Sequence, residues 1–203
     1  GLGDVYKRQD YKLTRGRVYQ EADDTNRTCF MRDRDRIIHS SAFRRLKYKT
    51  QVFVYHEEDY FRTRLSHSLE VSQLSRSISK VFNVNDDLSE SISLSHDLGH
   101  TPFGHAGEDV LNDKMKDKGG FNHNYQALKI LTVLEKKYLN FDGLNLSFET
   151  LDGILKHNGP IINKVPDYIQ NFIDFFNANK SLQGSFESQV AAMCDDIAYN
   201  NND

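Results

Sequence analysis

The stretch RLSHSLEVSQLSRSISKVFNVNDDLSESISLSHDLGH, residues 64–100, decides the fold. In its first half, apolar residues recur at three- and four-residue intervals, which is the period of one helix face. They are Val71, Leu74, Ile78 and Val81. Leu88 and Ile92 continue the same period in the second half. The stretch therefore predicts two amphipathic helices, over residues 64–83 and 87–100.

Polar residues stand on these stripes where apolar side chains are expected. His67 precedes Val71 by four residues, and His96 follows Ile92 by four, with Asp97 next to it. A single histidine at such a position is more often a hydrogen-bonded core residue than a ligand. A carboxylate in a core is costly unless it is paired or bound to a metal. The two interpretations stay open at this point.

A distant carboxylate, Asp195, falls on the apolar face of a later predicted helix, together with Ala191 and Tyr199. Two imidazoles and two carboxylates in one bundle would form a mixed nitrogen and oxygen donor set. Such a set suits Mn²⁺, Mg²⁺, Fe²⁺, Ni²⁺ or Zn²⁺ better than thiophilic ions. Spacing alone does not establish that these residues converge.

The rest of the chain is also predicted to be mainly helical, since it contains only 3 prolines and its apolar residues keep the helical period. The further predicted helices are residues 101–118, 124–139, 148–157, 166–177 and 185–199. One strand-like run, residues 51–55, could pair with the segment around Tyr60. The predicted fold class is all-α, a helical bundle with at most one short β-hairpin near residues 51–61.

Composition excludes several classes of protein. In 203 residues, 38% are hydrophobic, which is too many for a disordered chain, and 2 cysteines do not make a disulfide framework. No apolar run approaches the roughly 18 residues of a membrane span. The sequence therefore predicts a cytoplasmic protein with no membrane partner. The opening residues resemble a translated cloning scar, so residues 1–14 are predicted to be a non-native or disordered leader.

Charge is unevenly distributed. Residues 1–64 carry a net charge of +5 and residues 65–203 a net charge of −8, and only one arginine, Arg76, lies beyond position 64. Because guanidinium groups match phosphate oxygens, the first third is a candidate anion-binding region. The alternative is a solvated face with local Asp–Arg pairs, as residues 33–36 suggest.

Ordered blocks of sequence resemble the bacterial deoxyguanosinetriphosphate triphosphohydrolase-like family of the HD-domain metal-dependent phosphohydrolases. The signature is His67, then His96-Asp97, then Asp195. The surrounding blocks are residues 33–46, 48–53, 62–71, 96–105, 120–126, 141–146, 156–160 and 195–201. The resemblance implies that residues 15–203 are an HD domain, the N-terminal part of a longer protein whose C-terminal helices are missing here.

The resemblance implies a helical HD fold that hydrolyses deoxynucleoside triphosphates to the deoxynucleoside and inorganic triphosphate, by attack of water at the α-phosphorus. It implies one divalent metal ion, which would be Mn, Mg, Fe, Ni or Zn. The implied ligands are His67, His96, Asp97 and Asp195. Asp196 competes for the last position, but Tyr199 matches the family with Asp195 as the ligand.

The resemblance also implies roles around the substrate. His100, His105 and His123 would face the phosphates. His123 is favoured for proton transfer, whereas His105 could instead only orient its helix. Some relatives pair this histidine with a glutamate three residues later, where this chain has Gln126. The implied substrate-binding residues are Arg64, Gln51, Val52, Tyr199 and Asp203.

The implied partners are a deoxynucleoside triphosphate substrate, a regulatory deoxynucleoside triphosphate, single-stranded DNA and further copies of the chain in a homo-oligomer. Two other functions stay open from the sequence. One is an HD phosphohydrolase that acts on nucleoside monophosphates or other phosphoesters. The other is a nucleotide- or DNA-binding module with little turnover.

Overall fold

The computed structural model describes residues 9–51 and 62–200, and their regular elements are helices. The longer ones are α1 (Cys29–Ile38), α2 (Ser41–Arg45), α3 (Arg64–Phe82), α4 (Asp86–Ser95), α5 (Gly104–Lys114), α6 (His123–Lys129), α7 (Phe148–Leu155), α8 (Asp167–Phe175) and α9 (Phe186–Asn200). The predicted all-α fold class is confirmed. Most of the predicted hairpin, residues 52–61, lies outside the described residues, and Thr50 and Thr63 form an antiparallel bridge beside it.

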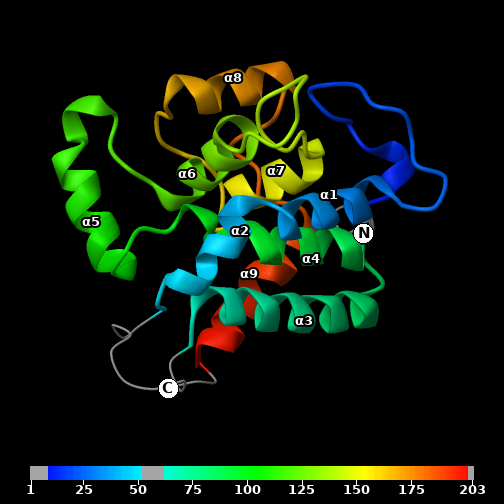
Figure 1. Ribbon diagram of the computed structural model, residues 1–203, viewed down its shortest axis with the longest axis horizontal. Coiled ribbons are helices and arrows are strands. Elements are labelled where there is room, and N and C mark those ends of the chain that lie inside the picture. Colours follow the sequence, from blue (N-terminus) through cyan, green and yellow to red (C-terminus); the bar gives the residue numbers. More distant parts are fainter. Residues whose placement is uncertain (1–8, 52–61, 201–203) are drawn as a thin grey trace.

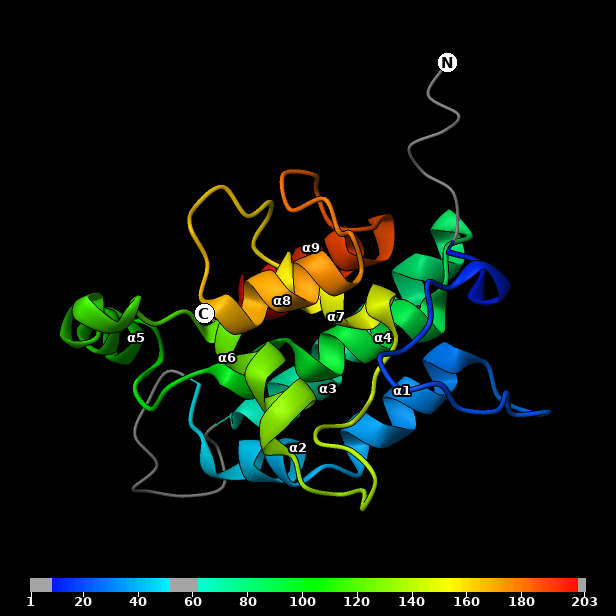
Figure 2. The ribbon, with the colours of Figure 1, turned by 90° about the horizontal axis from the view of Figure 1, so that it is seen from above.

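Helix α3 lies against α4 and α9, and α4 also contacts α1 and α7 (Figure 1). Seen from above, α8 and α9 lie on the opposite side of α4 from α1 and α2 (Figure 2). Helix α4 is therefore central: seven of its ten residues are buried. None of the helices in residues 9–51 and 62–200 combines the length and the hydropathy that a membrane span needs.

Small polar side chains, rather than the predicted apolar stripe alone, line the contact between α3 and α4. Val71 is buried, but Val81, the last predicted member of the stripe, is 82% exposed. Buried serines occupy the seam, and Ser75 and Ser93 share a hydrogen bond of 2.8 Å between their hydroxyls. Because serine side chains are short, the two helices can approach closely. This close approach sets His67 on α3 near the end of α4.

The predicted helix over residues 87–100 is wrong at its C-terminal end. Helix α4 stops at Ser95, and residues 96–99 form a separate 3₁₀ turn, η3 (His96–Gly99). A Cβ on Gly99 would lie 1.9 Å from the His123 carbonyl oxygen. Only glycine therefore allows η3 to pack on α6, and this contact brings His100 to His123.

The predicted helix over residues 101–118 also begins later, at Gly104. Thr101 does not cap it: its hydroxyl donates a hydrogen bond to the Gly104 carbonyl, and Phe103 precedes the helix with a φ of 69°. Helix α5 contains no buried residue and extends away from the other helices in both views (Figures 1 and 2).

Other helix ends shift by a few residues. Helix α6 continues as a π-helical turn, η5 (Ile130–Leu134), and stops well before the predicted end at Leu139. The reason is Glu135, a buried carboxylate that accepts hydrogen bonds from the Ser41 hydroxyl and the Ala42 amide of α2. These contacts hold Glu135 at the start of α2 rather than in a continuing helix.

Part of the segment predicted to be a leader is described and contacts the helices. The Gln9 amide donates to Glu187, and the Thr14 hydroxyl donates to Glu149. A 3₁₀ turn, η1 (Tyr11–Leu13), lies between them. The domain boundary near residue 15 stays a prediction.

Candidate metal and phosphate site

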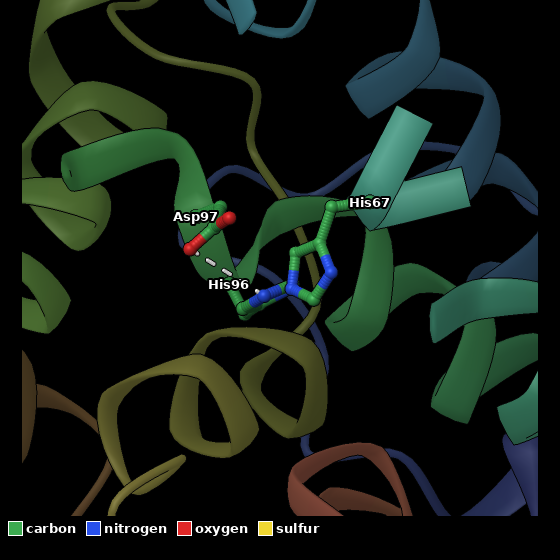
Figure 3. Close-up of side chains that lie close together, drawn as sticks. All are labelled: His67, His96 and Asp97. Carbon is green, nitrogen blue, oxygen red and sulfur yellow. Dashed lines mark ion pairs between the residues drawn. The ribbon is translucent and has the colours of Figure 1, made fainter. Parts of the chain in front are cut away.

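Three elements bring together the four predicted metal ligands. His67 comes from the first turns of α3, His96 and Asp97 from η3, and Asp195 from α9. His67 Nε2 lies 2.7 Å from Asp195 Oδ1, and His96 Nε2 lies 3.5 Å from oxygens of both Asp97 and Asp195. Figure 3 shows the imidazole of His67 directed toward the pair formed by His96 and Asp97. His67, His96 and Asp97 are each at least 97% buried.

These residues fit a divalent cation. Two neighbouring ligands that each lie about 2.1 Å from an octahedral ion are roughly 3 Å apart, close to the separations observed here. His96 Nδ1 donates a hydrogen bond to the Ser93 carbonyl, so in the neutral imidazole Nε2 carries the lone pair that a cation would bind. This Nε2 is buried and has no hydrogen-bond partner among the residues that the structure describes. The donor set is nitrogen and oxygen, as for the ions expected from the sequence.

Electrostatic coupling is strong within this cluster. Burial opposes the protonated form of His96, but the carboxylates of Asp97 and Asp195 outweigh it and raise the pKa of His96 to about 9. Burial likewise opposes the ionised forms of Asp97 and Asp195. The surrounding histidines prevail and hold the pKa of each carboxyl well below its usual value. Both carboxylates are therefore charged and able to act as ligands at neutral pH.

The structure also distinguishes the two aspartates that compete for the last ligand position. Asp195 is directed into the cluster, with Oδ1 facing His67 and Oδ2 facing His157. Asp196, the next residue on α9, is exposed. The geometry is thus compatible with Asp195, and not Asp196, as the ligand.

A second group of side chains adjoins the first. The imidazoles of His100 and His123 stack with ring centroids 4.1 Å apart, and His123 Nδ1 donates to Glu108 at 2.8 Å. Burial lowers the pKa of His100 to about 3, so this imidazole is neutral at neutral pH. Burial also acts to raise the pKa of Glu108, but hydrogen bonds from His123 lower it overall.

Glu108 was not predicted from the sequence. The expected glutamate three residues after His123 is Gln126 in this chain, and a carboxylate from α5 takes the neighbouring position instead. No sequence period relates Glu108 to His123, because they lie on different helices. His105, on the same helix as Glu108, has an 83% exposed side chain, and its ring lies 5.4 Å from that of His100.

The predicted substrate-binding residues differ in burial and in position, and two of them lie outside the described residues. Arg64 is buried and forms an ion pair of 2.9 Å with Asp97 Oδ2. The Gln51 carbonyl would lie 3.9 Å from a Cβ on Gly104, which places Gln51 near the start of α5. Tyr199 is about half exposed on α9, one turn beyond Asp195. Val52 and Asp203 lie outside the described residues.

Two further residues at the site were not predicted. Lys49 donates from Nζ to the carbonyls of Leu98 and His100 at 3.2 and 2.9 Å, and so holds η3 and the residue after it. His157, just beyond α7, directs Nε2 at Asp195 Oδ2, 3.3 Å away. Both residues lie in blocks that carry the family resemblance, 48–53 and 156–160, but no role was predicted for either, because each reaches the site only through tertiary packing.

The arginine-rich first third is largely neutralised by carboxylates. Around α1, each of five arginines has an acidic partner within 4 Å: Arg17 with Asp33, Arg27 with Asp24, Arg32 with Glu21, Arg34 with Glu90, and Arg36 with Glu21. Paired arginines agree with the alternative interpretation, but the pairs are only partly local and Asp33 is buried, so the segment is not simply a solvated face. Of the arginines that the structure describes in this third, Arg64 is the one paired with a predicted metal ligand.

Comparison with known protein families matches residues 64–199 to the HD domain. The chain belongs to the HD domain family. The match begins at Arg64, includes all four predicted ligands and ends at Tyr199, so the predicted recognition of an HD domain is confirmed.

Among curated relatives, the chain is similar to proteins named deoxyguanosinetriphosphate triphosphohydrolase-like. It is 58% identical to those of Parvibaculum lavamentivorans and Pelagibacter ubique, over 94% of this chain and 50% and 52% of the relatives. It is 54% identical to that of Roseobacter denitrificans, over 96% of this chain and 50% of the relative. The chain therefore spans about half the length of these relatives.

Proposed function

We propose that the protein hydrolyses deoxynucleoside triphosphates to the deoxynucleoside and inorganic triphosphate, with the help of one divalent cation. Membership of the HD family and similarity to dGTPase-like relatives support a metal-dependent phosphohydrolase. The observation that carries the proposal is that three separate elements bring His67, His96, Asp97 and Asp195 together, with Asp195 2.7 Å from His67 and His96 3.5 Å from both aspartates.

In this proposal the four residues hold the cation. A divalent ion at this position would lower the pKa of a water molecule and neutralise charge on a phosphate oxygen. His96 binds through Nε2, because its Nδ1 hydrogen is already bonded to the Ser93 carbonyl. Asp97 provides Oδ1, the oxygen nearer to the imidazoles of His96 and His100.

Arg64 binds a substrate phosphate. Its guanidinium is buried beside the metal ligands, and Nε has no hydrogen-bond partner among the described residues. The ion pair with Asp97 fixes the direction of the guanidinium, so that a phosphate next to the cation also meets a positive side chain. Such a contact stabilises the transition state to the extent that it strengthens as charge develops.

His123 transfers a proton. Its Nδ1 hydrogen is held by Glu108, which fixes the tautomer and leaves Nε2 free to accept or donate a proton. The charge of Glu108 would stabilise the imidazolium formed when His123 takes up a proton. Some relatives have a glutamate at the position of Gln126. With Glu108 bonded to His123, proton transfer in this chain does not depend on a carboxylate at position 126.

Gln51 and Tyr199 are proposed to contact the sugar. In the sequence, Gln51 precedes all four predicted ligands and Tyr199 follows them. An apolar or aromatic group against C2′ would disfavour a ribonucleotide, whose extra hydroxyl would be left without a partner. A regulatory nucleotide, single-stranded DNA and homo-oligomers stay predictions for the complete protein.

The decisive experiment is product analysis on the complete protein with each of the four deoxynucleoside triphosphates and Mn²⁺. The proposal expects inorganic tripolyphosphate and the deoxynucleoside, with no turnover by the Asp97→Asn variant. Phosphate or pyrophosphate as the sole phosphorus product would point to a different phosphoester hydrolase. Binding of single-stranded DNA without any cleavage of nucleotides would favour a binding module.

A further inference from the structure

His157 is a buried histidine that the proposed chemistry does not use. It follows α7, which ends at Leu155, and its side chain is 4% exposed. Its Nε2 lies 3.3 Å from Asp195 Oδ2. Its ring stacks on that of His96, with centroids 5.0 Å apart and planes 28° from parallel. His157 thus contacts two of the proposed ligands.

The two carboxylate oxygens of Asp195 face different residues. Oδ1 is 2.7 Å from His67 Nε2 and 3.5 Å from His96 Nε2, on the side of the cluster where ligand atoms gather. Among the histidines that the structure describes, His157 is the one that hydrogen-bonds to Oδ2. Because a carboxylate can only accept, His157 carries its hydrogen on Nε2 and donates it to Oδ2.

Asp195 needs such support more than its neighbours do. Its side chain is 29% exposed, whereas those of His67, His96 and Asp97 are at most 4% exposed. Packing therefore immobilises three of the ligands but leaves the fourth freer to rotate. A hydrogen bond to the distal oxygen is a common means of orienting a carboxylate ligand.

The position of His157 is itself fixed by contacts between α7, α9 and α4. The Ser188 hydroxyl of α9 donates to the Gly153 carbonyl of α7 at 2.8 Å. A Cβ on Gly153 would lie 2.4 Å from the Ile92 side chain, so any larger residue there would displace Ile92 and alter the approach of α7 to α4. The two contacts set the separation between His157 on one side and Asp195 and His96 on the other.

We propose that His157 is a positioning residue for the cation site, which orients Asp195 by donating a hydrogen bond to Oδ2, and is not itself a ligand. The inference rests on the cation site of the proposed function. The competing assignment is direct coordination, since nitrogens of His96 and His157 and an oxygen of Asp195 all lie within 4.8 Å of one another.

The test measures Mn²⁺ binding to the chain as it stands, by calorimetry, for the wild type and three variants. His157→Ala removes the donor and the ring, His157→Phe keeps a ring without a donor, and His157→Gln keeps an N–H donor. His39→Gln, at an exposed histidine, is the matched control. We expect Mn²⁺ affinity to fall about 10–100-fold in the alanine and phenylalanine variants. It should stay close to wild type in the glutamine and control variants.

Electron paramagnetic resonance of bound Mn²⁺ with ¹⁵N-labelled histidine counts the coordinated imidazoles directly. We expect two in the wild type and the same two in the His157→Gln variant. Three imidazoles in the wild type, reduced to two in the variant, would show that His157 is a ligand and overturn the proposal. Circular dichroism of each variant checks that a loss of affinity is not a loss of fold, and the glutamine variant provides the milder change.

The outcomes also separate this inference from the proposed function. If the wild type binds Mn²⁺ and affinity is unchanged in the alanine and phenylalanine variants, the positioning role is wrong and the cation site stands. If the wild type does not bind Mn²⁺, the cation site fails, and the role of His157 fails with it.

Discussion

Asp33 and Asp97 are both buried aspartates that face an arginine, and they differ in how completely their oxygens are bonded. Asp33 receives hydrogen bonds from Arg17 on one oxygen and from the Ser147 amide, the Ser147 hydroxyl and Thr150 on the other. Asp97 Oδ2 forms an ion pair of 2.9 Å with Arg64, but in the part of the chain that the structure describes this oxygen accepts no hydrogen bond of regular geometry.

The difference separates a structural region from a functional one. A fully bonded buried carboxylate stabilises one packing arrangement and leaves nothing for a ligand. A buried polar cluster whose atoms lack hydrogen-bond partners costs stability unless a ligand supplies those partners. The cluster around Asp97 contains several such atoms, including Nε2 of His96 and Nδ1 of His100. The arginine-rich region around α1 contains many charged side chains, but they are paired with one another. The histidine cluster is where buried atoms lack hydrogen-bond partners among the described residues.

The largest expected effect is loss of cation binding on Asp97→Asn. The substitution removes the charge that faces His96, so Mn²⁺ should no longer raise the stability of the chain. The wild type should gain about 2.7 kcal/mol when Mn²⁺ is at 100 times its dissociation constant. Urea denaturation with and without Mn²⁺ measures the gain. Asp196→Asn, the exposed control, should keep it, and a full gain in the Asp97 variant would contradict the assignment.

Asp33→Ala should have the largest effect on stability in the absence of metal. It leaves the Arg17 guanidinium buried without its counter-ion and removes the acceptor of two hydroxyls. Breaking a buried pair in this way costs about 3–5 kcal/mol. Urea denaturation of the metal-free protein measures the loss, with Asp35→Ala on the same helix as the control. A loss no larger than that of the control would erase the distinction between Asp33 and surface charges.

Glu108→Gln should reduce turnover by about 100-fold in the complete protein, which is the lower range for general acid–base catalysis. The variant keeps the size of the side chain but removes the charge that supports a protonated His123. Mn²⁺ affinity should be unchanged, because Glu108 lies outside the ligand cluster. Asp109→Asn, the exposed neighbour, is the control. Wild-type turnover in the Glu108 variant would exclude the proposed proton transfer.

The sequence predicted the parts of the site that lie on regular periods. His67 and His96 stand on helical stripes, and the resemblance supplied Asp195 as their distant partner. The end of α4 at Ser95 was missed, because the turn at η3 depends on the contact of Gly99 with α6 and not on local sequence. His157 was missed for the same kind of reason.

Helix α1 shows the opposite difficulty. Its residues 33–36 alternate acidic and basic side chains, which reads locally as a solvated segment. In the structure Asp33 is fully buried, because Arg17 and Ser147 come to it from distant parts of the chain. A charge inside a core is predictable only when its partners are known, and these partners are 16 and 114 residues away.

The pH dependence should run in opposite directions for the metal-free and metal-bound protein. In the folded protein the pKa of His96 is raised from 6.5 to about 9, so its stabilising charge is fully present below pH 6.5 and is lost as pH rises through 9. A cation needs the neutral imidazole, and its binding releases that proton. Mn²⁺ affinity should therefore rise with pH up to about 9, by at most about tenfold per pH unit for this group.

Urea denaturation and Mn²⁺ titration at pH 6.5, 7.5 and 8.5 measure both trends. The carboxyl groups of Asp97 and Asp195 contribute a constant charge over this window, because their pKa values are lowered. Mn²⁺ affinity that is independent of pH would show that His96 is already neutral in the metal-free protein.

The smallest effect is expected at the edge of the arginine-rich region. Arg34 lies within 4 Å of Asp35, Asp87 and Glu90, and its side chain is 21% exposed. Partly exposed ion pairs contribute about 0.2–1 kcal/mol, because solvent screens them and ordering long side chains costs entropy. Arg34→Ala should therefore lower the free energy of unfolding by less than about 1 kcal/mol, and 1 M salt should reduce the difference further. Mn²⁺ affinity should not change. A loss comparable to that of Asp33→Ala would mean that the ion pairs around α1 act as one unit. The difference between satisfied and unsatisfied buried groups would then distinguish whole regions, and not Asp33 and Asp97 alone.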